Sequence, residues 1–168
     1  MDLVAGPVHL SAPEGVNLVT VESAQEMLDA VLARVADADV FVGTAAVADY
    51  RPVAPAEQKI KKKFDEMQLE LTKNPDIIAT VAQQYPEVFT LGFAAETQDV
   101  ETYAKGKLAN KKLNMIACND VSDQSIGFNS DQNALTVITQ SAVVSLEKND
   151  KYKLAQQLVA LLVEAVSK

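Results

Sequence analysis

Two stretches of this sequence combine residue types that could bind a phosphorylated ligand. Residues 43–49 have small side chains that would let a base or a phosphate approach the backbone, and they end in the carboxylate of Asp49, which could accept a hydrogen bond from a ribose hydroxyl. Residues 59–63 contain four lysines in a chain whose net charge is −8. A lysine ammonium group can contact phosphate oxygens and follow a moving phosphoryl group. The alternatives are a turn of small residues made for packing and an ordinary solvated, charged loop.

Two further patterns later in the chain could contribute to an anion site. Asn74, Pro75 and Asp76 are typical of a helix start, with Asn at the cap and Pro at the first helical position. The free N–H groups of a helix start can bind an anion, although ordinary capping explains these three residues by itself. Lys107 and Lys111 are four residues apart and therefore share a helix face. They could bind an anionic partner or extend into solvent.

The elements that must position these residues alternate between strands and helices. Apolar runs and alternating patterns predict strands at residues 3–5, 16–21, 40–42, 67–72, 88–95 and 115–118. Apolar side chains at helical spacing predict helices at about 23–37, from residue 74 onwards, at about 100–113 and after Asn149 or Asp150. Ser23 and Glu26 have the spacing of a capping box. Strand, helix, strand with short connections indicates parallel pairing and right-handed crossovers.

Residues 135–139 and 143–146 alternate and lie close together, so they predict an antiparallel pair. We therefore expect an α/β fold, a Rossmann-like, doubly wound and mostly parallel sheet with a small antiparallel addition in the C-terminal third, forming one domain over residues 1–168. Ligands of such sheets bind beyond the carboxyl ends of the strands, which favours a site in the loop after residue 42. Phe93, in the strand at 88–95, could stack on a ligand there or fill the core.

Composition excludes several classes of function. A net charge of −8 argues against nucleic acid as the main partner, and no apolar run approaches the roughly 20 residues of a membrane helix. A single cysteine, Cys118, excludes an internal disulfide and favours a cytoplasmic setting, in which no signal peptide is expected. A single histidine, His9, leaves no His-rich metal cluster. The sequence has neither the GxGxxG nor the Walker pattern, so nothing supports a dinucleotide dehydrogenase.

Six segments of the chain resemble, in the same order, the bacterial phosphopantothenate–cysteine ligases. The resemblance covers nearly the whole chain, and six ordered segments are more specific than any one of them. This ligase is one half of the bifunctional coenzyme A biosynthesis flavoprotein, whose other half is an FMN-dependent decarboxylase. The segments are Ala-Ala-Val-Ala-Asp-Tyr at 45–50, Lys-Ile-Lys-Lys at 59–62, Lys-Asn-Pro-Asp-Ile at 73–77, Gly-Phe-Ala-Ala-Glu-Thr at 92–97, Asn-Asp-Val at 119–121 and Gly-Phe-Asn-Ser-Asp at 127–131.

The resemblance implies a two-step reaction. CTP would activate the carboxylate of 4′-phosphopantothenate as an acyl-cytidylate and release pyrophosphate, and the amine of L-cysteine would then attack the acyl carbon. The products would be 4′-phosphopantothenoylcysteine and CMP. Mg²⁺ is expected with the nucleotide, although the sequence names no ligand for it, and FMN is expected only in the separate decarboxylase domain.

The resemblance also implies roles for individual residues. Gly43, Thr44 and Ala45 would hold the nucleotide through backbone contacts, Asp49 would bind the ribose, and Lys59 would be the catalytic lysine on a closing loop. The remaining implied contacts are with the cytidine pocket for Pro75, Asp76, Ile77, Ile78 and Phe93, and with the triphosphate for Lys107 and Lys111.

The sequence departs from the family at its start. Family members begin the ligase domain with a strand, a loop rich in Gly, Ser and Asn, and a helix that together supply a catalytic asparagine, whereas here Met1 and Asp2 lead directly into what resembles the next strand. One alternative is therefore a nucleotide-binding or assembly module without complete catalysis, and another is a fragment of a Rossmann-type oxidoreductase. Family members dimerise, and the antiparallel pair after Ser122 is the expected contact of a homodimer.

Overall fold

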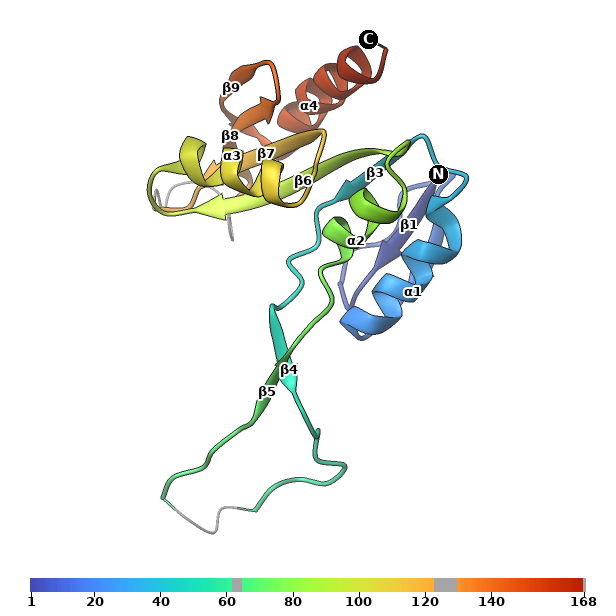
Figure 1. Cartoon of the computed structure of the whole chain (residues 1–168), viewed down its shortest axis with the longest axis vertical. Coiled ribbons are helices and arrows are strands. Elements are labelled where there is room, and N and C mark those ends of the chain that lie inside the picture. The colour runs from blue at the N-terminus through green and yellow to red at the C-terminus, as the bar shows by residue number, and fades with distance from the viewer. Residues whose placement is uncertain (62–64, 123–129, 168) are drawn as a thin grey trace. The chain divides into compact units, whose positions relative to one another are not determined.

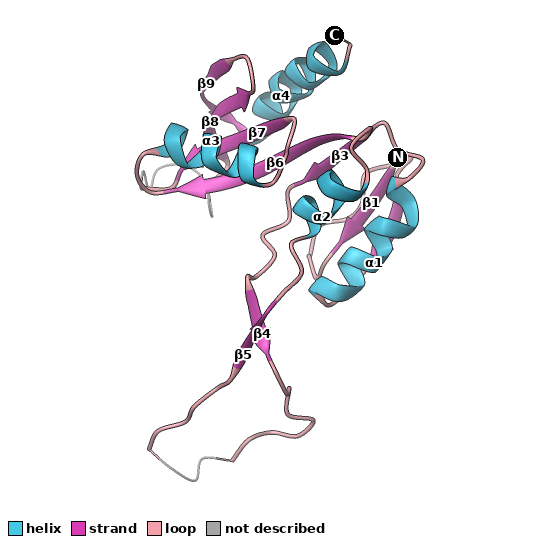
Figure 2. Ribbon diagram, in the orientation of Figure 1, coloured by secondary structure: helices cyan, strands magenta, loops and turns pink. Residues whose placement is uncertain are grey.

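The computed structural model describes residues 1–61, 65–122 and 130–167 (Figure 1). The described residues divide into two compact units, Met1–Ala33 with Ala45–Ile77, and Arg34–Thr44 with Ile78–Lys168. None of the helices in the described ranges is long and apolar enough to cross a membrane. The elements along the chain (Figure 2) are β1 (Asp2–Ala5), β2 (Asn17–Thr20), α1 (Ala24–Val35), β3 (Val40–Gly43), β4 (Tyr50–Pro52), β5 (Leu71–Lys73), α2 (Ile77–Gln84), β6 (Phe89–Glu96), α3 (Val100–Asn110), β7 (Met115–Asp120), β8 (Gln132–Thr139), β9 (Val143–Asp150) and α4 (Lys151–Val166).

The first unit begins with the parallel pair β1 and β2, followed by α1. The predicted capping box at the start of α1 is confirmed. The backbone N–H of Glu26 donates to Ser23 Oγ (3.2 Å), and Glu26 Oε2 accepts from the N–H groups of Glu22 (2.8 Å) and Ser23 (3.3 Å). These backbone hydrogen bonds, with that from Glu22 the strongest, lower the pKa of the Glu26 carboxyl group.

The other part of this unit is a two-stranded antiparallel ribbon, β4 with β5. The strand β4 was not predicted, and the strand predicted at 67–72 is wrong in its extent, because β5 covers only Leu71–Lys73. Pro52 has no N–H to donate and therefore fits only the edge of such a ribbon. One further backbone bond, from Val53 N to Glu70 O (3.0 Å), extends the pairing. Lys62 and Lys63 of the predicted lysine run lie outside the described residues.

The predicted helix start at Asn74 is wrong, because α2 begins at Ile77. The Asn74 side chain does not cap a helix. Its Nδ2 donates to the carbonyl oxygen of Ala48 (2.8 Å), and its Oδ1 accepts from Arg51 Nη1 (3.1 Å). Arg51 Nη1 also donates to the carbonyl oxygen of Lys73 (2.8 Å). Asn74 therefore joins the start of β4 to the end of β5, and its side-chain amide, which a helix cap would use, is engaged in these contacts.

The second unit is built on a five-stranded sheet of order β3-β6-β7-β8-β9. The pairs β3–β6 and β6–β7 are parallel, whereas β7–β8 and β8–β9 are antiparallel. The predicted antiparallel pair is confirmed but longer than expected, since polar residues extend β8 at its start and β9 at its end. Asp150 caps α4 by accepting a hydrogen bond from Lys153 N (2.9 Å).

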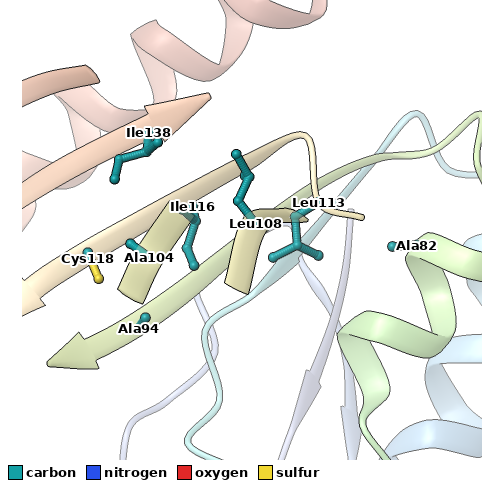
Figure 3. Close-up of a cluster of buried hydrophobic side chains, with 8 residues drawn as sticks. All are labelled: Ala82, Ala94, Ala104, Leu108, Leu113, Ile116, Cys118 and Ile138. Atoms are coloured by element: carbon teal, nitrogen blue, oxygen red, sulfur yellow. The ribbon is translucent and has the colours of Figure 1, made fainter. Parts of the chain in front are cut away.

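Helices cover both faces of this sheet, as the alternation of side chains along β7 shows. Ile116 and Cys118 belong to a core cluster with Ala104 and Leu108 of α3 (Figure 3). Met115 and Ala117 belong to a second cluster with side chains of α4. Successive residues of a strand point to opposite faces, so α3 and α4 lie on opposite sides of β7. The predicted doubly wound α/β fold, a mostly parallel arrangement with an antiparallel addition, is therefore confirmed.

Gly92 of β6 lies where the packing leaves no room for a side chain. A Cβ at this position would be 2.9 Å from Leu113 Cδ1 and 3.0 Å from Ile78 Cδ1. We expect Gly92→Ala to lower the free energy of unfolding by about 1 kcal/mol, the lower end of overpacking costs, since both methyl ends can partly rotate away. Urea denaturation measures the change.

Gly106 of α3 provides the matched control, since a Cβ there would meet nothing within 4 Å. Glycine inside an exposed helix costs about 1 kcal/mol relative to alanine, so Gly106→Ala should raise the free energy of unfolding by about that amount. If both substitutions stabilised the protein equally, the close packing around Gly92 would be wrong.

Candidate functional site

The carboxyl ends of three parallel strands meet at one edge of the sheet in the second unit. β3 ends at Gly43, β6 at Glu96 and β7 at Asp120. Gly43 pairs with Gly92, and Glu96 pairs with Asp120, so β6 and β7 extend beyond the last paired residue of β3. Since ligands of parallel sheets bind at this edge, the loop after Gly43 leaves the sheet where a site is expected.

Ile78 packs beside the glycines at the end of β3 and in the middle of β6. A Cβ on Gly43 would lie 3.1 Å from Ile78 Cδ1, so the missing side chain is what allows this contact. Phe93 follows Gly92 on β6 and therefore points to the opposite face of the strand. Its side chain is 39% exposed, so Phe93 is not core filling. The structure thus brings two predicted site residues of the second unit, Gly43 and Ile78, together. It places Phe93 on the other face of β6. Thr44 follows Gly43 along the chain and is exposed.

Lys107 brings a positive charge to the same edge. Its Nζ lies 2.7 Å from Glu96 Oε1, and its side chain is 45% exposed. Lys111, the second predicted triphosphate ligand, is the residue that caps the C-terminal end of α3, and its N–H donates to the carbonyl oxygen of Lys107 (3.0 Å). Glu96 was not among the predicted site residues. The available signal was a carboxylate at the end of a buried apolar run.

Asn74 lies next to four of the predicted site residues of the first unit. The backbone N–H of Asn74 donates to the carbonyl oxygen of Asp49 (2.8 Å), which joins the segment that contains Asp49 to the segment that follows Asn74. The Asp49 side chain itself is exposed. Asn74 is followed along the chain by Pro75, Asp76 and Ile77, so the contact brings the start of their segment to Asp49.

Lys59 lies in the connection between β4 and β5, and Ala45 follows the second unit's Thr44 along the chain. Lys59 is exposed. The predicted role of Lys59 in the site stays a prediction.

The described residues fit a metal ion that arrives with a nucleotide better than one held by the protein. Within the described ranges, no three His, Cys, Asp or Glu side chains gather into a metal site. At the carboxyl edge, Glu96 contacts Lys107, and Asp120 Oδ1 accepts hydrogen bonds from Ser122 N (2.9 Å) and Ser122 Oγ (2.6 Å). Mg²⁺ is commonly held by one or two carboxylates together with substrate phosphates. A Mg²⁺ ion bound at this edge would take substrate phosphates among its ligands.

A cavity of about 430 Å³ in the second unit lies away from this edge. Its lining includes Asn114, directly before β7, and Thr139, the last residue of β8. Thr139 pairs with Met115, the first residue of β7, so the cavity lies at the amino end of that strand. The cavity is therefore separate from the predicted site.

Cys118 is buried in the core next to the charged pair at the carboxyl edge. Burial, followed by the nearby Glu96 carboxylate, raises the pKa of the Cys118 thiol from an ordinary value of 9 to about 11, while the Lys107 ammonium group opposes the increase. At pH 8 the thiolate fraction should be about 100-fold lower than in the unfolded chain, because two pKa units separate the states. We expect the thiol to react with a disulfide reagent at least about 100-fold more slowly in the folded protein than in urea.

The same pKa shift has a defined effect on stability. As the pH rises, the unfolded chain loses the thiol proton at a lower pH than the folded protein does. The contribution of Cys118 to the free energy of unfolding is therefore complete below pH 9 and is lost as the pH rises through about 11. In the test with the disulfide reagent, rapid reaction of the folded protein at pH 8 would contradict the burial of this thiol. The variant Cys118→Ala, which has no thiol, is the control for that measurement.

The chain matches a family model described as DNA/pantothenate metabolism flavoprotein C-terminal domain over residues 1–166. It is similar to the coenzyme A biosynthesis bifunctional protein CoaBC of Vibrio parahaemolyticus, with 51% identity over 160 residues that cover 94% of this chain and 40% of the relative. It is also 46% identical, over 154 residues, to the protein of the same name from Escherichia coli K12, covering 88% of this chain and 38% of that relative. The chain thus spans about two-fifths of the length of these curated relatives.

Among solved structures, the chain resembles the C-terminal domain of a CoaBC protein. The TM-score is 0.79 at 35% identity, and the alignment covers 96% of this chain and 71% of that one. A Cab2 mutant in complex with phosphopantothenate-cysteine has a TM-score of 0.68 at 13% identity, covering 92% of this chain and 55% of that chain. At that identity the second likeness concerns the fold alone.

Proposed function

The chain belongs to the family of DNA/pantothenate metabolism flavoprotein C-terminal domains, and from this premise we propose that it acts as a CTP-dependent ligase that joins 4′-phosphopantothenate to L-cysteine. CTP activates the substrate carboxylate as an acyl-cytidylate and loses pyrophosphate. The amine of cysteine then attacks the acyl carbon, and 4′-phosphopantothenoylcysteine and CMP leave. Mg²⁺ bound to the nucleotide phosphates supplies positive charge that favours departure of pyrophosphate.

The observation that carries this proposal is the half-exposed ammonium group of Lys107 at the carboxyl edge of the parallel strands. A cation placed where charge develops on a leaving pyrophosphate stabilises the transition state. In the second unit, Gly43 and Thr44 contact the nucleotide through their backbone, and the triphosphate contacts are made by Lys107 and Lys111. Contacts with the cytidine are proposed for Ile78 on one face of β6 and for Phe93 on the other.

The first unit contributes the remaining contacts of the proposed reaction. Ala45 continues the backbone contacts with the nucleotide, and Asp49 accepts hydrogen bonds from the ribose hydroxyls. Lys59 is the catalytic lysine, on a loop that closes over the reactive acyl-cytidylate and excludes water. Contacts with the cytidine are proposed for Pro75, Asp76 and Ile77.

Several partners follow from the same proposal. The protein acts in the cytoplasm as a homodimer, together with or fused to a phosphopantothenoylcysteine decarboxylase domain that holds FMN. The whole chain forms one CTP-binding domain. Contact through the antiparallel pair after Ser122 stays a prediction; residues 123–129 of that region, which include three of the matched positions at 127–131, lie outside the described residues.

Thermal unfolding in the presence of nucleotides tests the binding step. A ligand that binds only the folded state stabilises it by about 2.7 kcal/mol at a hundredfold excess over its dissociation constant. We expect CTP with Mg²⁺ to raise the melting temperature more than ATP or NAD does. A larger shift with NAD would overturn the proposal.

Product formation tests the chemistry. Pyrophosphate release from CTP should require 4′-phosphopantothenate, and formation of the cysteine adduct should require L-cysteine as well. CTP binding without pyrophosphate release would leave the chain as a nucleotide-binding module and would contradict the ligase assignment for this chain.

A further inference from the structure

The pair formed by Glu96 and Lys107 is asymmetric. The Glu96 side chain is 15% exposed and the Lys107 side chain 45% exposed, with Oε1 and Nζ 2.7 Å apart. Glu96 Oε1 is fully covered, and no group in the described parts of the chain donates a well-aligned hydrogen bond to it. The covered carboxylate oxygen thus relies on the ammonium group as its partner, while the ammonium group keeps part of its surface toward solvent.

The position of Lys107 on α3 explains why it needs a partner to reach the carboxyl edge. Lys107 lies seven residues after Val100, roughly 10 Å along the helix axis. Side chains of a helix tilt toward its N-terminus, and α3 begins shortly after β6 ends at Glu96. The lysine side chain therefore extends back toward the end of β6. A half-exposed lysine without a partner would sample many rotamers instead.

We propose that Glu96 is a positioning residue, which holds the ammonium group of Lys107 at the carboxyl edge in the place where it binds the triphosphate of CTP. The inference rests on the proposed function, in which Lys107 contacts the triphosphate. An ammonium group that is already ordered does not have to be immobilised when the ligand binds, so the binding step loses less conformational entropy. Because Glu96 is covered, an incoming phosphate meets the ammonium group before it meets the carboxylate.

A second ion pair on the same helix is the matched control. Lys105 Nζ lies 2.5 Å from Glu101 Oε1, and the two side chains are 53% and 55% exposed. The pair is an i,i+4 contact at the surface, a type that contributes little. Replacing Glu101 by alanine removes one negative charge from the protein, as Glu96→Ala does, but leaves the partner of Lys107 in place.

The test is a double-mutant cycle on CTP affinity, measured by isothermal titration of the whole chain with CTP and Mg²⁺. We expect Glu96→Ala to weaken CTP binding about tenfold, the size of the ordering cost of one long side chain. In a Lys107→Ala background, Glu96→Ala should cause no further loss, because Glu96 acts through Lys107. Glu101→Ala should change the affinity by less than about twofold.

Glu96→Gln keeps the side-chain volume and an oxygen that can accept from the ammonium group. It should weaken binding less than Glu96→Ala, and it keeps the test valid if the alanine variant does not fold. Tighter binding by Glu96→Gln, an unchanged affinity in Glu96→Ala, or additive losses in the double variant would each overturn the positioning role.

The outcomes separate this inference from the proposed function. If the unmodified chain binds CTP and Lys107→Ala weakens the binding, the proposed function stands, and any of the three contrary results for Glu96 refutes the positioning role alone. If the unmodified chain does not bind CTP, both are wrong.

Discussion

Replacing Lys59 by alanine is expected to slow pyrophosphate release from CTP by about 10²- to 10³-fold, with a much smaller change in CTP affinity. As the proposed catalytic lysine, Lys59 would add positive charge where negative charge develops in the transition state, and removing one such group from a site typically has an effect of this size. An interaction made only in the transition state lowers kcat and kcat/KM together. Single-turnover measurements of pyrophosphate release, beside CTP titrations, distinguish this result from a loss of binding.

Lys153→Ala is the control for the loss of one positive charge. Lys153 is an exposed lysine of α4 whose Nζ lies 3.7 Å from Asp150 Oδ2, and no proposed site residue lies on this helix. Its replacement should leave pyrophosphate release within about twofold of the unmodified rate. An equal fall in rate and in CTP affinity for Lys59→Ala would mean that Lys59 binds the ground state and is not the catalytic lysine.

Leu154→Ala is expected to lower the free energy of unfolding by about 2–5 kcal/mol. Leu154 is 2% exposed and packs in the cluster between α4 and the sheet, where Met115 and Ala117 of β7 are 1% and 0% exposed. Removing three carbon atoms there forfeits buried apolar surface and leaves a cavity that the neighbouring strand can fill only in part. Since domains unfold with about 5–15 kcal/mol, the loss would be a large part of the total.

Val159 lies on the same helix and is the matched control for this substitution. Its side chain is 56% exposed, so Val159→Ala should change the free energy of unfolding by less than about 0.5 kcal/mol. Urea denaturation of both variants measures the difference. Equal losses would mean that α4 presents a different face to the sheet from the one described here.

The sequence by itself determined most elements of the second unit's sheet. The runs at 40–42, 88–95 and 115–118 became β3, β6 and β7. Most residues of β6 and β7 are buried, and strands covered on both faces must be apolar at nearly every position. The capping box of Ser23 with Glu26 and the helix cap at Asp150 could also be predicted from the sequence, since each joins residues within four positions of one another. Such patterns depend only on residues that are close in the sequence, so they can be recognised without knowledge of the fold.

The tertiary structure alone decided what Asn74 and Glu96 do. Asn74 has the residue type and spacing of a helix cap, yet its amide contacts Ala48 and Arg51, more than twenty positions earlier. Glu96 pairs with Lys107 across the turn from a strand to a helix, at a distance that depends on how α3 lies on the sheet. Such contacts form between segments brought together by packing, and no local periodicity records them, because the same residue types favour a cap or a solvated charge when considered alone.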